Sequence, residues 1–311
     1  MRVRDIGESA FIERIRRRVP PAEVRLGIGD DAAIVDVPAG HSIVYCSDLL
    51  AENTHFLREL HPPDSLGYKA VAVNVSDVGA MGGTPMYLTL SVALPGELDL
   101  EWMDGFIDGL ARACKEFEVS LVGGDSSSAT NIFIDVSMIG SVPSGQEVRR
   151  SGAKAGDGIY VTGSLGGSAL GLDNLRSGNS SHPSVQRHLY PTPRYRVGRA
   201  IAAQAHAMID ISDGLSTDLN HIVQQSKVCA RIYKRLLPGA EDATDAHVLH
   251  GGEEYELIIV APELPAEVEG VPITRIGEIV PAAMDPQIYI IDGSTESVLV
   301  PQGYQHFNTR A

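Results

Sequence analysis

Apolar residues recur at intervals of three and four between residues 99 and 118, and this spacing predicts an amphipathic helix. Its inward positions are Met103, Phe106, Ile107, Leu110, Cys114 and Phe117. A second helix is expected within residues 65–81, which are rich in small side chains. An amphipathic helix is also predicted close to the N-terminus, on the face formed by Phe11, Ile12 and Ile15.

Short apolar runs between these helices predict strands. The alternation of Ile132, Ile134, Val136 and Met138 is typical of a half-buried strand. Further strands are expected at residues 33–35, 42–48, 119–122, 159–162, 208–212 and 255–260. Helices should follow the glycines at 163–167 and begin again at Asp213, so strands alternate with helices in both halves. This pattern predicts α/β or α+β layers. Residues 177–193 are expected to be a polar loop without chemistry.

The length of 311 residues favours two domains, since one domain usually takes about 150. Apolar residues make up 43% of the chain and charged residues 21%, which is enough to form a core. Residues 143–158 are rich in glycine, serine and charge and are poor in large apolar side chains. We therefore expect an N-terminal domain over 1–142 and a C-terminal domain over 143–311.

The net charge of −15 disfavours binding to nucleic acid, whose phosphates would be repelled. An anionic small molecule remains compatible, because a divalent cation can join protein carboxylates to substrate phosphates. The cysteines Cys46, Cys114 and Cys229 are far apart and odd in number, which argues against a disulfide framework. Without an apolar run of about 20 residues, no membrane partner is expected, and a cytoplasmic location is predicted.

Glycine-rich segments are the first candidates for phosphate binding. Gly27-Ile28-Gly29-Asp30-Asp31-Ala32 resembles a dinucleotide fingerprint, but a strand is expected after it where a helix would be required. The turn at 163–167 stands between a strand and a helix, yet its glycine spacing is wrong, and a tight turn is the simpler interpretation. A Walker lysine motif is absent from the sequence. A nucleotide would therefore bind without a P-loop.

A set of aspartates stands at the ends of apolar elements. Any one of them could simply cap a helix or start a turn, Asp213 in particular. Together they form a carboxylate set of the kind that holds several Mg²⁺ ions with substrate phosphates. The side chains of Asp210 and Ser212 should share a face, and Asp213 should open a helix whose amides favour a phosphate. The members are Asp30, Asp31, Asp48, Asp77, Asp125, Asp210 and Asp213.

The order of several motifs resembles the thiamine-monophosphate kinase family, of the superfamily shared with aminoimidazole ribonucleotide synthetase and selenophosphate synthetase. The resemblance extends over nearly the whole chain. In addition to the segment at 27–32, the matching motifs are Ser47-Asp48 with His55-Phe56, residues 69–77 with Ala80-Met81-Gly82, Gly123-Gly124-Asp125, Arg150-Ser151-Gly152-Ala153, residues 209–215, residues 251–257 and residues 303–307.

This resemblance implies an enzyme of thiamine biosynthesis, a transferase that phosphorylates thiamine monophosphate to thiamine diphosphate with ATP. It implies a homodimer in which mixed N-terminal sheets with helices join in a barrel, and a C-terminal α/β sandwich that completes the ATP and substrate site. ATP would be bound by Gly124, Asp125, Arg150 and Ser212. The thiamine end would be bound by His55, Glu253, Pro301 and Tyr304.

Several Mg²⁺ ions are the cofactors that the resemblance implies. Asp77 and Asp210 would act in catalysis through metal, and no protein base is expected. Direct in-line transfer follows, because the acceptor phosphate is already largely ionised at neutral pH. The complete set of expected metal ligands, which includes residues from both halves, is Asp30, Asp31, Cys46, Ser47, Asp48, Asp77, Asp125, Asp210 and Asp213.

Three positions depart from the family pattern. Cys46 replaces a small hydroxylated residue, so a metal contact there would have to use its backbone carbonyl. Glu254 replaces an aspartate. Pro301 aligns where the family tends to have an aromatic residue against the thiamine ring, a role that Tyr304 could take over.

Two alternative functions remain open from the sequence. One is another ATP-dependent synthetase or a hydrogenase-maturation enzyme of the same superfamily. The pair His55-Phe56 and the segment at 251–257 favour the thiamine kinase over it. The other is a non-catalytic module that binds Mg²⁺ and nucleotide, whose ligands would look the same.

Overall fold

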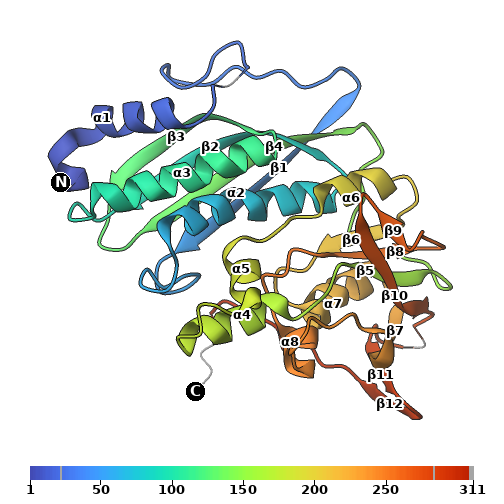
Figure 1. The fold of residues 1–311 in the computed structure, drawn as a ribbon. Coiled ribbons are helices and arrows are strands. Elements are labelled where there is room, and N and C mark those ends of the chain that lie inside the picture. The colour runs from blue at the N-terminus through green and yellow to red at the C-terminus, as the bar shows by residue number, and fades with distance from the viewer. Residues whose placement is uncertain (22, 283, 308–311) are drawn as a thin grey trace. The chain divides into compact units, whose positions relative to one another are not determined.

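The computed structural model describes residues 1–21, 23–282 and 284–307 (Figure 1). The chain divides into two compact units. The first comprises Met1–Val78 and Gly83–Gly145, and the second comprises Gly79–Gly82 and the residues from Gln146 onward. The division after Gly145 compares with the boundary after residue 142 expected from the composition.

The first unit is built on a sheet with the strand order β1-β4-β2-β3. Strand β4 pairs antiparallel with both of its neighbours, and β2 and β3 run parallel, joined through helix α3. Figure 1 shows α2 and α3 together over one face of the sheet. The elements are α1 (Val3–Arg18), β1 (His41–Ala51), α2 (Pro63–Ala80), β2 (Thr84–Leu94), α3 (Leu100–Glu116), β3 (Ser120–Ser128) and β4 (Phe133–Pro143).

The core of this unit lies between the sheet and its helices. Alternate residues of β2 and β4 are buried, as expected for strands covered on one face: Leu88, Leu90, Val92, Ile134, Val136 and Met138. Helices α2 and α3 approach each other closely where each has a glycine. A Cβ at Gly67 would overlap the carbonyl oxygen of Phe106, and a Cβ at Gly109 would overlap that of Asp64. Small residues are therefore required at this contact.

The second unit contains a sheet in the order β12-β11-β7-β10-β5-β8-β6, and β9 pairs with β10 outside this path. Its strands are β5 (Gly158–Thr162), β6 (Ala207–Asp210), β7 (Cys229–Tyr233), β8 (Leu257–Ala261), β9 (Glu267–Val268), β10 (Val271–Val280), β11 (Ile288–Asp292) and β12 (Thr295–Val298). Its helices are α4 (Gly167–Arg176), α5 (Pro183–Leu189), α6 (Tyr195–Ile201), α7 (Leu215–Ser226), α8 (Asp245–His250) and the 3-10 turn Lys234–Leu236.

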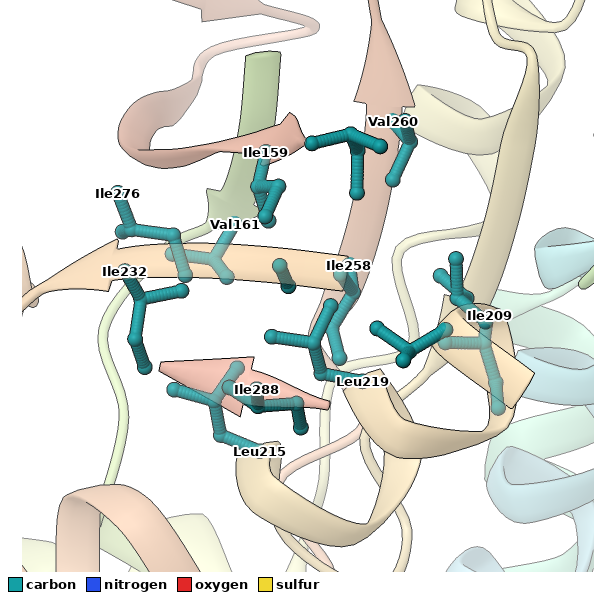
Figure 2. Close-up of a cluster of buried hydrophobic side chains, with 14 of the residues drawn as sticks. Ile159, Val161, Ile209, Leu215, Leu219, Ile232, Ile258, Val260, Ile276 and Ile288 are labelled. Carbon is teal, nitrogen blue, oxygen red and sulfur yellow. The ribbon is translucent and has the colours of Figure 1, made fainter. Parts of the chain in front are cut away.

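The central strands β5 and β8 are buried throughout, because each of their faces meets a separate apolar cluster. On one face, Ile159, Ile258 and Val260 pack with Leu215 and Leu219 of α7 (Figure 2). On the other face, Tyr160, Leu257 and Ile259 pack with Val197 and Ile201 of α6. Strand β6, which ends at Asp210, lies at the edge of this sheet and is paired with β8.

The expected α/β organisation in two parts is confirmed, with mixed sheets in both units. The proposed dimer barrel remains a prediction. Among the helices of the described residues, none is long and apolar enough to cross a membrane.

Two local predictions are wrong. Residues 33–35 do not form a strand; Ile34 makes an isolated bridge to Leu26 within a turn-rich segment. The expected loop at 177–193 contains helix α5. Pro183 occupies its first turn, and the His182 side chain accepts a hydrogen bond from the Ser184 amide, so the cap stabilises a helix that polar composition concealed. In addition, β3 continues through the glycine pair to Ser128.

The close approach of α2 and α3 makes Gly109→Ala a test of the packing. Alanine normally stabilises a helix interior by about 1 kcal/mol relative to glycine. Here we expect the free energy of unfolding to fall by about 1–3 kcal/mol, because the new methyl group must push the helices apart. Urea denaturation measures the change. The exposed α3 substitution Glu101→Ala should stay within about 0.5 kcal/mol of the wild type. An increase in stability for Gly109→Ala would contradict the packing described.

Candidate active site

A cavity of about 480 Å³ in the first unit joins two motifs that are far apart in the sequence. One wall is the glycine-rich segment 27–33 and another is the β3 segment 123–126. Apolar side chains of α1 and β2 complete the lining, among them Phe11, Ile15 and Leu90. The cavity thus combines an apolar surface with the carboxylates of Asp30, Asp31 and Asp125, and its volume is that of a small-molecule pocket.

The backbone around these carboxylates is held locally. Asp30 Oδ1 accepts a hydrogen bond from the Asp31 amide at 2.8 Å, and Asp125 Oδ1 accepts one from the Ser126 amide at 2.9 Å. Gly124 lies opposite Leu90 in the parallel ladder, where a Cβ would overlap the Leu90 carbonyl oxygen. Glycine is therefore needed for β3 to pair with β2, in addition to any role toward a ligand.

Strand β1 separates its candidate residues onto two faces. Cys46 and Asp48 share one face, and the Cys46 Sγ lies 3.6 Å from the side-chain oxygen of Asn74 on α2. Asp77 follows Asn74 by one helical turn, so it lies on the same side of α2. Ser47 points to the opposite face, where its hydroxyl donates to Asp135 Oδ2 at 3.0 Å. The side chain of Ser47 therefore does not join those of its two neighbours.

His55 lies in the turn that follows β1. Its Nδ1 accepts a hydrogen bond from the Ala51 amide at 3.0 Å, and its own amide donates to the Ala51 carbonyl at 2.9 Å. Because Nδ1 is an acceptor, the neutral ring carries its proton on Nε2. The ring is therefore fixed by the backbone, and Nε2 is its donor atom.

In the second unit, the chain passes from β6 to α7 through residues 211–214. The N-cap of α7 is Gly214, so Asp213 does not cap the helix. Asp218, one turn inside the helix, accepts hydrogen bonds through Oδ2 from the Asp213 and Gly214 amides, each at 3.0 Å. The interpretation of Asp213 as a helix cap is therefore wrong, because the carboxylate that accepts from the amides at the start of α7 belongs to Asp218.

Three carboxylates gather at this turn. Burial raises the pKa of Asp218 well above its usual range, and the charges of Asp210 and Asp213 raise it further. Burial also raises the pKa of Asp213, with His221, His306 and Arg150 acting against it. Ligand atoms of Asp213, Asp218 and His221 lie within 4.8 Å of one another. This donor set fits a cation, because a positive charge would offset the repulsion among the carboxylates.

The segment 251–257 is hydrogen-bonded directly to the same turn. The Glu253 amide donates to the Ser212 carbonyl at 2.7 Å, and the Glu254 and Tyr255 amides donate to the Ile211 carbonyl at 3.1 and 2.9 Å. Ile211 in turn donates to the Glu256 carbonyl at 2.8 Å. The structure therefore brings the expected residues Asp210, Ser212 and Asp213 together with Glu253.

Residues 302–304 run along the first turn of α7. The Tyr304 amide donates to the Asp213 carbonyl at 3.1 Å, and the Gly303 amide donates to Thr217 Oγ1 at 3.1 Å. Tyr304 is about half exposed, and its ring meets that of His306 edge-on at 4.8 Å. Pro301 precedes these contacts and is partly buried. Tyr304 is thus the aromatic residue that the backbone places beside Asp213.

Comparisons with known proteins identify the family of this chain. The AIR synthase related protein models match residues 29–142 for the N-terminal domain and 154–285 for the C-terminal domain. Thiamine-monophosphate kinase from Escherichia coli K12 is 39% identical, over 97% of this chain and 99% of its own length. The chain belongs to the thiamine-monophosphate kinase family. The family resemblance expected from the motifs is confirmed.

Solved structures of thiamine-monophosphate kinases share the fold as well as the sequence. The Stenotrophomonas maltophilia K279a enzyme is 33% identical with a TM-score of 0.81, and the match covers 92% of this chain and 96% of that one. A structure of AaThiL in complex with AMPPCP and TMP is also 33% identical, with a TM-score of 0.79 and 99% coverage of both chains.

Sequence reasoning missed several residues of this member of the thiamine-monophosphate kinase family. Asp218 and His221 both lie near Asp213, and their spacing of three on α7 could have indicated a shared face. Asp135 on β4 also accepts a hydrogen bond from Ser47 and is absent from the expected set. No sequence pattern marks Asp135, because its partner comes from a strand almost 90 residues away.

Proposed function

We propose that this chain transfers the γ-phosphoryl group of ATP to thiamine monophosphate and forms thiamine diphosphate and ADP. The observation that carries this proposal is the 39% identity to a thiamine-monophosphate kinase over 97% of the chain. The complex of AaThiL with AMPPCP and TMP supports both substrates. Structures of the hydrogenase maturation protein HypE cover a similar length of this chain but are only 22% identical, so they support the shared fold and not the maturation activity.

The cavity of the first unit supports a nucleotide site. Phe11, Ile15 and Leu90 offer an apolar surface for a base, while Gly124 and Asp125 line the cavity from β3. In the second unit, we propose that Arg150 and Ser212 contact the phosphates. Arg150 is close enough to Asp213 to oppose the rise in its pKa, which supports a position for Arg150 beside the phosphate site.

We propose that Mg²⁺ ions are held by the carboxylates of Asp30, Asp31, Asp48, Asp77, Asp125, Asp210 and Asp213, with backbone oxygens of Cys46 and Ser47. The outward direction of the Ser47 side chain favours a carbonyl contact there. Bound Mg²⁺ would reduce the repulsion between two polyanions and align their phosphates. Asp77 and Asp210 would then act by holding Mg²⁺ beside the phosphates, and neither needs to accept a proton.

The chemistry of the acceptor explains why no protein base is required. A phosphate monoester has a second pKa near ~6, so its oxygen is largely ionised at neutral pH. The residues therefore have to bind the two substrates and keep them in line. We propose direct transfer without a phosphoenzyme.

At the thiamine end, we propose that His55 and Glu253 bind the substrate, and that Tyr304 supplies the aromatic surface beside Pro301. His55 offers Nε2 as a donor because Nδ1 is engaged by Ala51. The side chain of Glu253 is 28% exposed and can reach a ligand. The half-exposed ring of Tyr304 favours it over Pro301 for stacking.

We further propose a cytoplasmic homodimer. Edge strand β1 exposes an apolar row on one face: Ile43 at 61%, Tyr45 at 66% and Leu49 at 48%. A second copy of this chain would cover that row and the open strand edge. Cys46, Cys114 and Cys229 form no disulfide in the described part of the chain, which fits a reducing compartment.

The activity can be tested by incubating the protein with ATP, Mg²⁺ and thiamine monophosphate and separating thiamine diphosphate by chromatography. Chelation should abolish product formation. We expect Asp77→Asn and Asp210→Asn each to lower kcat at least ~100-fold, because each removes a carboxylate that would hold Mg²⁺ against the transferring phosphoryl. The exposed Asp108→Asn on α3 serves as the control and should retain wild-type kcat. Absence of product from the wild type would instead favour a non-catalytic binding module.

The route of transfer can be tested with ATP that is chiral at the γ-phosphorus. A single in-line step inverts the configuration, so inverted thiamine diphosphate is expected. Retention, or a phosphorylated histidine or aspartate trapped after a quench, would contradict direct transfer.

Light scattering should give a mass about twice 33.2 kDa at micromolar concentration. Tyr45→Glu should shift the protein to a monomer, because a charge in the apolar row would be buried at the interface. Leu236→Glu adds a charge at an exposed apolar position of the second unit and should leave the dimer intact. A monomeric wild type would refute the homodimer.

A further inference from the structure

Two arginines of the second unit reach buried carboxylates: Arg187 on α5, and Arg194 at the N-cap of α6. Arg194 forms a fork on Glu256, with Nε to Oε2 and Nη2 to Oε1 both at 2.7 Å. Arg187 Nη2 lies 3.1 Å from Glu256 Oε1 and 3.0 Å from Glu254 Oε2. One guanidinium therefore joins two buried carboxylates of the segment that carries Glu253.

Other donors complete this arrangement. Thr162 Oγ1 donates to Glu256 Oε2 at 2.6 Å, and the Ser168 amide donates to Glu254 Oε1 at 2.8 Å. Burial raises the pKa of Glu254 to about 7, and Arg187 acts against this rise. The side chains of Glu254 and Glu256 thus attach the segment 251–257 to β5, α4 and α5.

The backbone between these anchors is in an unfavourable conformation. Glu253 and Tyr255 have φ angles of 59° and 54°, in the left-handed region that residues other than glycine rarely adopt. The amides of 253–255 nevertheless remain hydrogen-bonded to the Ile211 and Ser212 carbonyls. Such a conformation persists only where the surroundings hold it, and the buried ion pairs supply that restraint.

His188, at the end of α5, contacts the side chain of Glu253 itself. Its ring is 2% exposed, and its Nδ1 lies 3.4 Å from Glu253 Oε2 and 3.0 Å from Ser168 Oγ. A carboxylate can only accept, so the contact requires a proton on Nδ1. With that proton shared toward Ser168 and Glu253, the ring fixes one side of the carboxylate while 28% of the Glu253 side chain stays exposed.

We infer that His188 is a positioning residue that holds the Glu253 carboxylate in the orientation that binds thiamine monophosphate. This inference rests on the proposed role of Glu253 in substrate binding. His188 itself does not need to touch the substrate. Its effect should therefore appear in the binding of thiamine monophosphate and be absent from the binding of ATP.

The test is a double-mutant cycle on the full-length protein with steady-state kinetics in both substrates. His188→Leu should raise the KM for thiamine monophosphate about tenfold and leave the KM for ATP within twofold. His188→Asn, whose amide can replace the Nδ1 donor, should recover most of the loss. Glu253→Ala should raise the same KM, and adding His188→Leu to it should have no further effect, because the two residues act through one contact.

Leu189→Ala is the matched control, since Leu189 packs in the small core of α5 with Leu175 and Val185 and does not carry the contact. It should lower the unfolding temperature while preserving the KM for thiamine monophosphate. An equal KM increase in Leu189→Ala, or additive effects in the double variant, would overturn the role of His188. If Glu253→Ala leaves that KM unchanged, the proposed substrate role of Glu253 is itself wrong.

Discussion

The repulsion among carboxylates is the constraint on which the candidate site depends. The chain has a net charge of −15, and at the β6–α7 turn Asp210, Asp213 and Asp218 are close enough for the charges of the first two to raise the pKa of the third. Burial strengthens the effect, because water no longer screens the charges. Such a cluster persists in a folded protein only where cations or amide donors balance it.

The second unit balances its carboxylates in two different ways. Glu254 and Glu256 are paired with Arg187 and Arg194 inside the protein, at nitrogen–oxygen distances of 2.7–3.1 Å. At the β6–α7 turn, the Asp218 carboxylate accepts hydrogen bonds from backbone amides. The charge of the Asp213 carboxylate is opposed by the nearby charges of Arg150, His221 and His306. The first group is therefore balanced within the protein, whereas the second leaves negative charge that the proposed Mg²⁺ ions would balance.

The burial of the central strands on both faces explains how these groups are kept in place. Strands β5 and β8 have apolar clusters on both faces, and β6 is paired with β8 up to Asp210. The turn after β6 and the segment before β8 are therefore adjacent, and the same segment supplies Glu256 to the arginines. In the first unit, the parallel pair β2–β3 has the corresponding role, since it carries Gly124 and Asp125 to the wall of the cavity.

The sequence alone determined the long amphipathic helix α3, the alternating strand β4, the α/β organisation and the family, because periodicity and motif order are local or linear properties. It could not determine which motifs meet. Strand register and helix phase decide three further features. Residues 27–33 and β3 line one cavity, and Ser47 and Asp48 point to opposite faces of β1. Helix α7 has Gly214 as its N-cap, and Asp218 accepts the hydrogen bonds expected of Asp213. The segment 177–193 shows the difference most clearly. Its polar composition predicted a loop without chemistry, yet Arg187 and His188 become functional candidates because their partners lie more than 60 residues away and meet them only in the folded chain.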